Sequence, residues 1–241
     1  MREHFRFLRS RKMSFDQLGP FILLLIGVAA LGFGPSYFTK LWGQATKFSF
    51  YFHFHAVCMV LWLVTVAVQP YLIRRGKRRL HKRIGRLTYG LFPVMILSIL
   101  LLIHHQLVAT SRGTSTDLFI PIKDVAIMCL GYGMAYFWKK QPALHARWMV
   151  VTIIPMIEPS LVRMLHHLLP TSLQANPYEL TLGVVDALLL GLAVADSKKP
   201  KVRWVFVTVL VIMILCQVII LSGILDAPLN LTAPKGVAFF A

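Results

Sequence analysis

Seven long apolar runs, separated by short basic segments, dominate the sequence. A hydrocarbon core about 30 Å thick is crossed by roughly 20 residues of α-helix, and each run is close to that length. We therefore expect an all-α fold, a polytopic membrane bundle of about seven transmembrane helices that forms a single domain over residues 1–241. The expected spans lie near residues 19–39, 50–73, 87–109, 118–138, 148–169, 179–196 and 204–225.

The composition excludes an ordinary soluble domain. Hydrophobic residues make up 57% of the chain and charged residues only 15%, whereas soluble domains carry about 25% charged residues. The three cysteines, Cys58, Cys129 and Cys216, each lie inside an apolar run and have no C-x-x-C spacing. We interpret them as small buried hydrophobic residues.

The distribution of basic residues predicts the orientation of the bundle. If the runs cross alternately, 20 of the 26 Lys and Arg residues fall on one side, within residues 1–12, 74–86, 139–147 and 198–203, and only four on the other. Cytoplasmic loops carry this excess, so we expect the N-terminus in the cytoplasm and the C-terminus outside. Contact with anionic lipids then accounts for the net charge of +17, and nucleic acid is not needed to explain it.

Ionisable residues inside the runs are the best clue to function. Each costs about 2.5 to 3.5 kcal/mol on insertion scales, so those that persist usually face a cavity or a partner. The fourth run is the least certain span because it contains Pro121, Lys123 and Asp124. The residues of this kind that fall in the outer half of the bundle are His53, His55, His104, His105, Lys123, Asp124, Glu158, Arg163, His166, His167 and Asp186.

Helical spacing indicates which of these residues face the interior. His55 and Trp62 share one face of the second span, which makes His55 the better candidate for a pocket residue. In the fifth span Arg163 shares a stripe with His166 or His167, which places a cation beside an imidazole. Pro155 and Pro159 remove backbone donors and predict a kink that leaves carbonyl groups free near Glu158.

Three histidines with nearby carboxylates are typical of a transition-metal site. His55, one of His104 and His105, and one of His166 and His167 are candidate ligands for zinc, iron or copper, with Glu158 or Asp186 as the general base. A b-type haem is the second interpretation. His55 and a histidine of the third or fifth span would then be the axial ligands, with Trp62 against the porphyrin and Arg163 nearby.

Two other classes of function stay open. Glu158, Arg163 and Asp186 are suited to the intramembrane path of a proton-coupled or small-solute transporter. Alternatively, the polar residues form a structural network in a non-catalytic assembly protein. In that network Arg163 would pair with Asp186 or Glu158, and Lys123 and Asp124 would pair with neighbours across the bundle.

Two basic clusters lie where helices leave the cytoplasmic interface. One contains His81, Arg83 and Arg86, and the other contains His145 and Arg147. Such clusters predict a site for a lipid phosphate or an anionic substrate. The alternative is a belt of snorkelling side chains that only fixes the orientation.

The same segments carry a family resemblance over roughly half the chain. The run His81-Lys-Arg-Ile-Gly85-Arg86, the element His145-Ala-Arg147-Trp148-Met149 and the later Arg163 resemble the bacterial multi-pass proteins grouped as "domain of unknown function 2306". The resemblance implies a multi-pass protein of the bacterial inner membrane, without an assigned reaction. A more distant likeness is to the ascorbate-type dihaem b cytochromes, which carry histidines near both membrane faces. This chain departs from them because His81 and His145 lie at the very ends of their spans.

Overall fold

The computed structural model describes residues 18–42, 48–110, 115–169 and 177–225. Over these ranges the chain is almost entirely helical and contains no strand. The elements are α2 (Leu18–Phe33), the π-helical turn η1 (Gly34–Phe38), α3 (Thr39–Trp42), α4 (Phe50–Arg74), α5 (Arg78–Thr110), α6 (Ser115–Phe137), α7 (Pro142–Val151), α8 (Ile157–Leu168), α9 (Pro177–Asp196) and α10 (Trp204–Leu221).

Five of these helices, α4, α5, α6, α9 and α10, are long and apolar enough to cross a membrane. They correspond to the second, third, fourth, sixth and seventh expected spans, including the uncertain fourth. The first expected span is instead α2 followed by η1 and α3, and the fifth is divided between α7 and α8. The two chain termini lie outside the described residues, so the predicted placement of each terminus stays a prediction.

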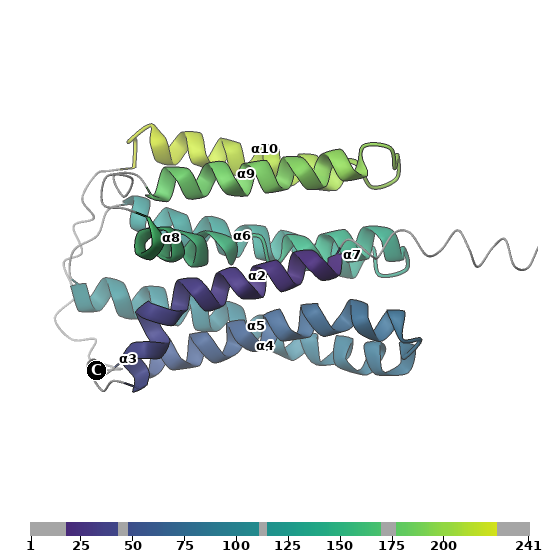
Figure 1. The fold of residues 1–241 in the computed structure, drawn as a ribbon, viewed down its shortest axis with the longest axis horizontal. Coiled ribbons are helices and arrows are strands. Elements are labelled where there is room, and N and C mark those ends of the chain that lie inside the picture. Colours follow the sequence, from purple (N-terminus) through teal and green to yellow (C-terminus); the bar gives the residue numbers. More distant parts are fainter. Residues whose placement is uncertain (1–17, 43–47, 111–114, 170–176, 226–241) are drawn as a thin grey trace, which may run out of the picture.

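The helices lie side by side along one common axis (Figure 1). The most extensive contacts are those of α4 with α5, α2 with α8, α6 with α7 and α9 with α10. The outer surface of the bundle is apolar, with Leu215 and Val218 of α10 each 60% exposed. Such a surface would be unfavourable in water and is typical of helices that face lipid.

The helix of the fifth expected span is broken in the middle of the bundle. α7 ends at Val151 and α8 begins at Ile157, and Pro155 lies in the segment between them. Thr152 is fully buried, and its Oγ1 accepts a hydrogen bond from Trp62 Nε1 at 3.2 Å. The predicted disruption near Pro155 is therefore confirmed. Between the two α-helices the chain continues as tight turns, in which amides donate to carbonyl groups three residues earlier. Non-helical backbone is tolerated at this depth because protein surrounds it.

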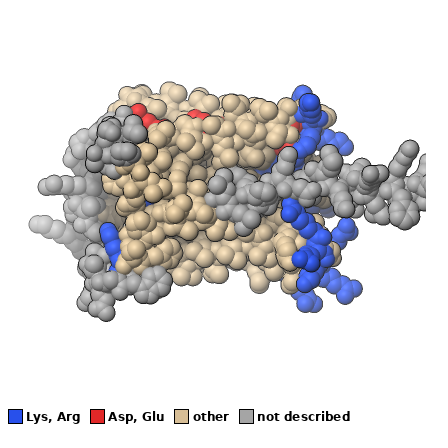
Figure 2. Space-filling model, in the orientation of Figure 1, with Lys and Arg blue, Asp and Glu red and all other residues tan. Residues whose placement is uncertain are grey.

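Basic side chains gather at one end of the bundle (Figure 2). At that end lie the connections α4 to α5, α6 to α7 and α9 to α10 (Figure 1). The sequence predicted that these segments lie on the same side, because they carry most of the Lys and Arg residues. The opposite end of the described bundle has few basic side chains in this view.

Candidate functional site

Three charged residues lie together inside the described bundle, namely Lys123, Asp124 and Glu158, which we call the Lys123 cluster. Lys123 Nζ lies 2.7 Å from Asp124 Oδ1 and 3.0 Å from Glu158 Oε1. The side chains of Lys123 and Glu158 are only 1% and 3% exposed. The ammonium group therefore joins α6 to the first turn of α8, directly after the break.

The cluster lies well inside the apolar bundle. Lys123 comes eight residues after the start of α6, which at 1.5 Å per residue is about 12 Å along the helix. Gly131, two turns further along α6, packs closely against the break, because a Cβ atom there would lie 3.1 Å from the Thr152 nitrogen. This close approach brings α6 near enough to the broken helix for Lys123 to reach Glu158.

Tyr178 of α9 extends the polar surroundings of the Lys123 cluster. It lies near enough to Glu158 and Lys123 to interact with them electrostatically. Its hydroxyl is buried and has no hydrogen-bond partner among the residues that the structure describes. A buried hydroxyl without a partner is unfavourable, so this group is available to bind a proton acceptor or a ligand beside the cluster.

Arg163 does not make the predicted ion pair with Glu158 or Asp186. Its Nη1 donates to the Pro159 carbonyl at 2.6 Å, and its guanidinium lies 4.9 Å from the centroid of the Phe33 ring. Glu158 pairs with Lys123 instead. Asp186 forms a separate contact, accepting a hydrogen bond at 3.0 Å from Gln217 Nε2 of α10.

His55 does face the bundle interior, as the helical spacing predicted. Its Nδ1 lies 3.3 Å from the hydroxyl of the fully buried Ser98 of α5. Arg163 is close enough to interact with it electrostatically. Trp62, on the same face of α4, is fully buried, and its ring packs against Phe92 and Tyr132 at centroid distances of 5.2 and 5.6 Å.

The other outer histidines do not join His55. His104 is exposed, and His105 packs on the Tyr51 ring at 4.8 Å. His166 and His167 are exposed at the end of α8, with ring centroids 5.6 Å apart. Among the described residues, no group of three or more His, Cys, Asp or Glu side chains is arranged to hold a metal ion. This geometry gives no support to the metal and haem interpretations, which stay predictions.

The two basic clusters at one end of the bundle are likewise separated by the fold. Arg147 is buried and makes a two-pronged ion pair through Nε and Nη2 with Asp196, so its guanidinium is already occupied. His145 Nδ1 donates to the Ala135 carbonyl at 2.8 Å. The main-chain carbonyl of His81 accepts a hydrogen bond from Gln69 Nε2 at 3.3 Å. Arg83 and Arg86 are exposed and remain open to an anion.

Sequence reasoning missed two residues of these sites. Asp196 is the partner of Arg147, and its position at the end of an apolar run, level with the basic clusters, was a usable signal. Tyr178 had no such signal, because a tyrosine near the end of a span is typical of the membrane interface.

A comparison of the chain with protein-family models, with curated proteins and with solved structures found no match in any of the three. The resemblances described from the sequence therefore stay predictions.

Proposed function

We propose that this chain is a proton-coupled membrane transporter of a small solute, and that the Lys123 cluster is its proton-binding site. The observation that carries the proposal is the contact of one buried ammonium group with two carboxylates at the break between α7 and α8. Charge balance, the broken helix and the unpartnered hydroxyl each support it.

Charge balance supports a bound proton. With all three groups ionised, the Lys123 cluster holds one cation and two anions, which leaves one excess negative charge. A single unbalanced charge is strongly disfavoured in an apolar interior. No second Lys or Arg makes an ion pair with Asp124 or Glu158 in the part of the chain that the structure describes. A proton on one of the two carboxyl groups removes the excess charge.

The broken helix supports transport rather than a static structural role. In membrane transporters, substrate and coupling-ion sites are typically formed by discontinuous helices near the middle of the bilayer. Here Glu158 lies in the first turn of the second half-helix, and the buried hydroxyl of Tyr178 is close by. Arg163, one turn after Pro159 on the same half-helix, supplies a cation for an anionic group of the solute.

The proposal includes seven spans in a bacterial inner membrane, with the basic end in the cytoplasm. Residues 18–42 and 142–168 are each long enough for the roughly 20 residues that a crossing needs. In a cysteine-free background, Ser197→Cys at the basic end should react with an impermeant thiol reagent only from the cytoplasmic side. Leu168→Cys, at the exposed end of α8, should react only from outside. Labelling of both from one side would refute this topology.

The test of function is proton flux into vesicles that contain the purified protein. A potential that is negative inside should drive protons inward, recorded by a pH-sensitive dye in the lumen. The assay is repeated with the small-molecule fraction of a cell extract, because a strictly coupled carrier moves no proton without its solute. Glu158→Gln should reduce the flux to the rate of empty vesicles.

The matched control is Glu179→Gln, which changes an exposed glutamate in the first turn of α9. It should leave the flux unchanged. Wild-type flux equal to that of empty vesicles, with and without the extract, would reject the transporter. An equal loss in both variants would reject the Lys123 cluster as the site.

A further inference from the structure

The turn between α4 and α5 has a fixed shape. Gly76 has a φ of 70°, a left-handed conformation that glycine adopts without strain. The amide of Gly76 donates to the Ile73 carbonyl at 3.0 Å and that of Lys77 to the Leu72 carbonyl at 2.8 Å. These bonds hold the following basic residues in defined positions at the cytoplasmic end of the bundle.

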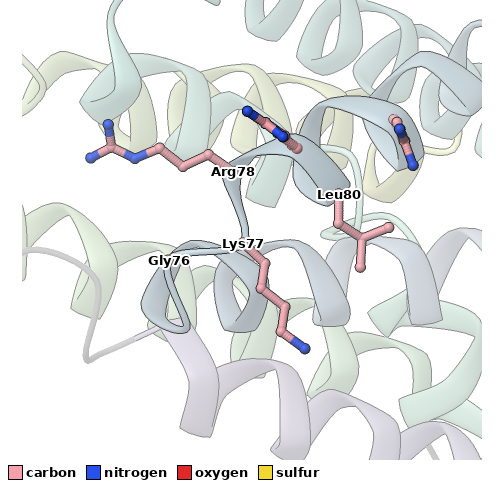
Figure 3. A pocket seen from close by; sticks show the side chains of 6 residues that line it. Gly76, Lys77, Arg78 and Leu80 are labelled. Atoms are coloured by element: carbon pink, nitrogen blue, oxygen red, sulfur yellow. The ribbon is translucent and has the colours of Figure 1, made fainter.

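A surface pocket of about 690 Å³ opens beside this turn. It is lined by Gly76, Lys77, Arg78, Arg79, Leu80 and Arg83, and we call it the hairpin pocket. In the view of Figure 3, Lys77 and Leu80 extend to the same side of the turn, whereas Arg78 extends away from them. The lining of the pocket thus includes both charged and apolar side chains.

No ion pair between described residues involves the basic side chains of the hairpin pocket. All four basic residues that line it are exposed. Among the described residues, the one carboxylate at this end of the bundle is Asp196, and it is already paired with Arg147 and Lys199. The first-turn amides of α5, which begins at Arg78, add a further partial positive charge. The site is therefore suited to an anion with several acceptor oxygens.

Exposed apolar side chains also lie on the two helices that this turn connects. Leu80 inside the pocket is 41% exposed, Tyr71 on α4 is 53% exposed and Leu87 on α5 is 71% exposed. A free anion would make no favourable contact with these apolar side chains. A molecule with a phosphate headgroup and long hydrocarbon chains uses both parts, because the headgroup binds the basic residues and the chains cover the apolar side chains.

We propose that the hairpin pocket binds the headgroup phosphate of an anionic phospholipid of the cytoplasmic leaflet. Arg79 and Arg83 lie one turn apart on α5 and bind the phosphate oxygens, and Leu80 contacts the start of the acyl chains. The sequence predicted that Arg147 also contributes to an anion site. Arg147 does not bind the phosphate, because its guanidinium is already paired with Asp196. This site is independent of the Lys123 cluster, which lies inside the bundle.

The test is lipid binding to the detergent-purified full chain by native mass spectrometry. Phosphatidylglycerol is titrated into wild type and into the double variant Arg79→Gln/Arg83→Gln. Loss of two basic contacts should weaken phosphatidylglycerol binding by at least about tenfold. Phosphatidylcholine, which has the same phosphate but no net charge, should bind weakly and equally to both proteins.

The matched control is Lys198→Gln/Lys201→Gln, which removes two exposed cations from the α9 to α10 connection at the same end. It should weaken binding less than twofold. Equal losses in the two variants would reject a defined site in favour of diffuse surface charge. Equal binding of phosphatidylcholine and phosphatidylglycerol would also overturn the proposal.

Inorganic phosphate distinguishes a lipid from a free anion. At concentrations that saturate simple phosphate sites it should displace little phosphatidylglycerol, because it cannot replace the acyl-chain contacts. If it displaces the lipid completely and binds wild type but not Arg79→Gln/Arg83→Gln, the pocket is a free-phosphate site and the lipid assignment is wrong. The four residues changed in these variants are exposed, so unchanged thermal unfolding should accompany every result.

Discussion

Lys123 Nζ lies 3.0 Å from Glu158 Oε1, and this contact connects the fourth expected span to the first turn of the half-helix that follows the break in the fifth. Both side chains are almost completely buried. A buried ion pair contributes little net stability, but removing one partner leaves an uncompensated charge. The pair therefore predicts that substituting Lys123 alone destabilises the protein.

Lys123→Met should lower the free energy of unfolding by about 3 to 5 kcal/mol, because Asp124 and Glu158 lose their shared cation. Adding Glu158→Gln to Lys123→Met should recover part of that loss, since fewer buried charges remain. Chemical unfolding in detergent measures both values. Lys139→Met, which removes an exposed cation, is the control. A cost for Lys123→Met no greater than for this control would contradict the buried pair.

The ion pair of Arg147 with Asp196 predicts a second loss of stability, at the basic end of the bundle. Arg147→Ala should cost about 3 to 5 kcal/mol, because it leaves the Asp196 carboxylate with Lys199 alone. Arg147→Lys should recover only part of this, since an ammonium group cannot reproduce the two-pronged contact. The exposed Lys198→Ala is the control and should change stability by less than about 0.5 kcal/mol. Equal stability of Arg147→Ala and Lys198→Ala would show that the pair is not formed.

Two glycines of α2 give a matched pair for the packing of α2 on α8. A Cβ atom at Gly32 would collide with the main-chain carbonyl of Ser160, whereas at Gly27 it would meet open space. Gly32→Ala should therefore destabilise the protein by about 1 to 3 kcal/mol, the usual cost of overpacking. Gly27→Ala should be neutral or slightly stabilising. Similar thermal unfolding of the two variants would contradict this close helix contact.

The fold was largely predictable because the length of an apolar run determines whether a helix can cross a membrane. The position of a residue along its run also gave its depth, which placed Lys123, Asp124 and Glu158 at a similar level. The rotation of each helix about its axis depends on packing that a single sequence does not reveal. That is why His55 faces inward as predicted, whereas His104 is exposed and Arg163 is not the partner of Glu158.

The metal and haem interpretations have a direct test of their own. Elemental analysis and the visible absorption spectrum of the purified protein report zinc, iron, copper or haem b. His55→Ala should remove any such bound species, because His55 is the outer histidine that faces the interior near Ser98. Occupancy that is unchanged in His55→Ala would refute its assignment as a ligand.

The central claim, that the Lys123 cluster holds one proton on its two carboxyl groups, is tested most directly by infrared spectroscopy. A protonated carboxyl group has a C=O stretching band distinct from that of a carboxylate, so spectra of the reconstituted protein at neutral pH report its presence. We predict a protonated-carboxyl band in wild type that keeps its intensity in Glu179→Gln and loses intensity in both Asp124→Asn and Glu158→Gln, with any remaining band assigned to Asp186. A wild-type spectrum without this band, or a band that keeps its full intensity in both cluster variants, would contradict the account.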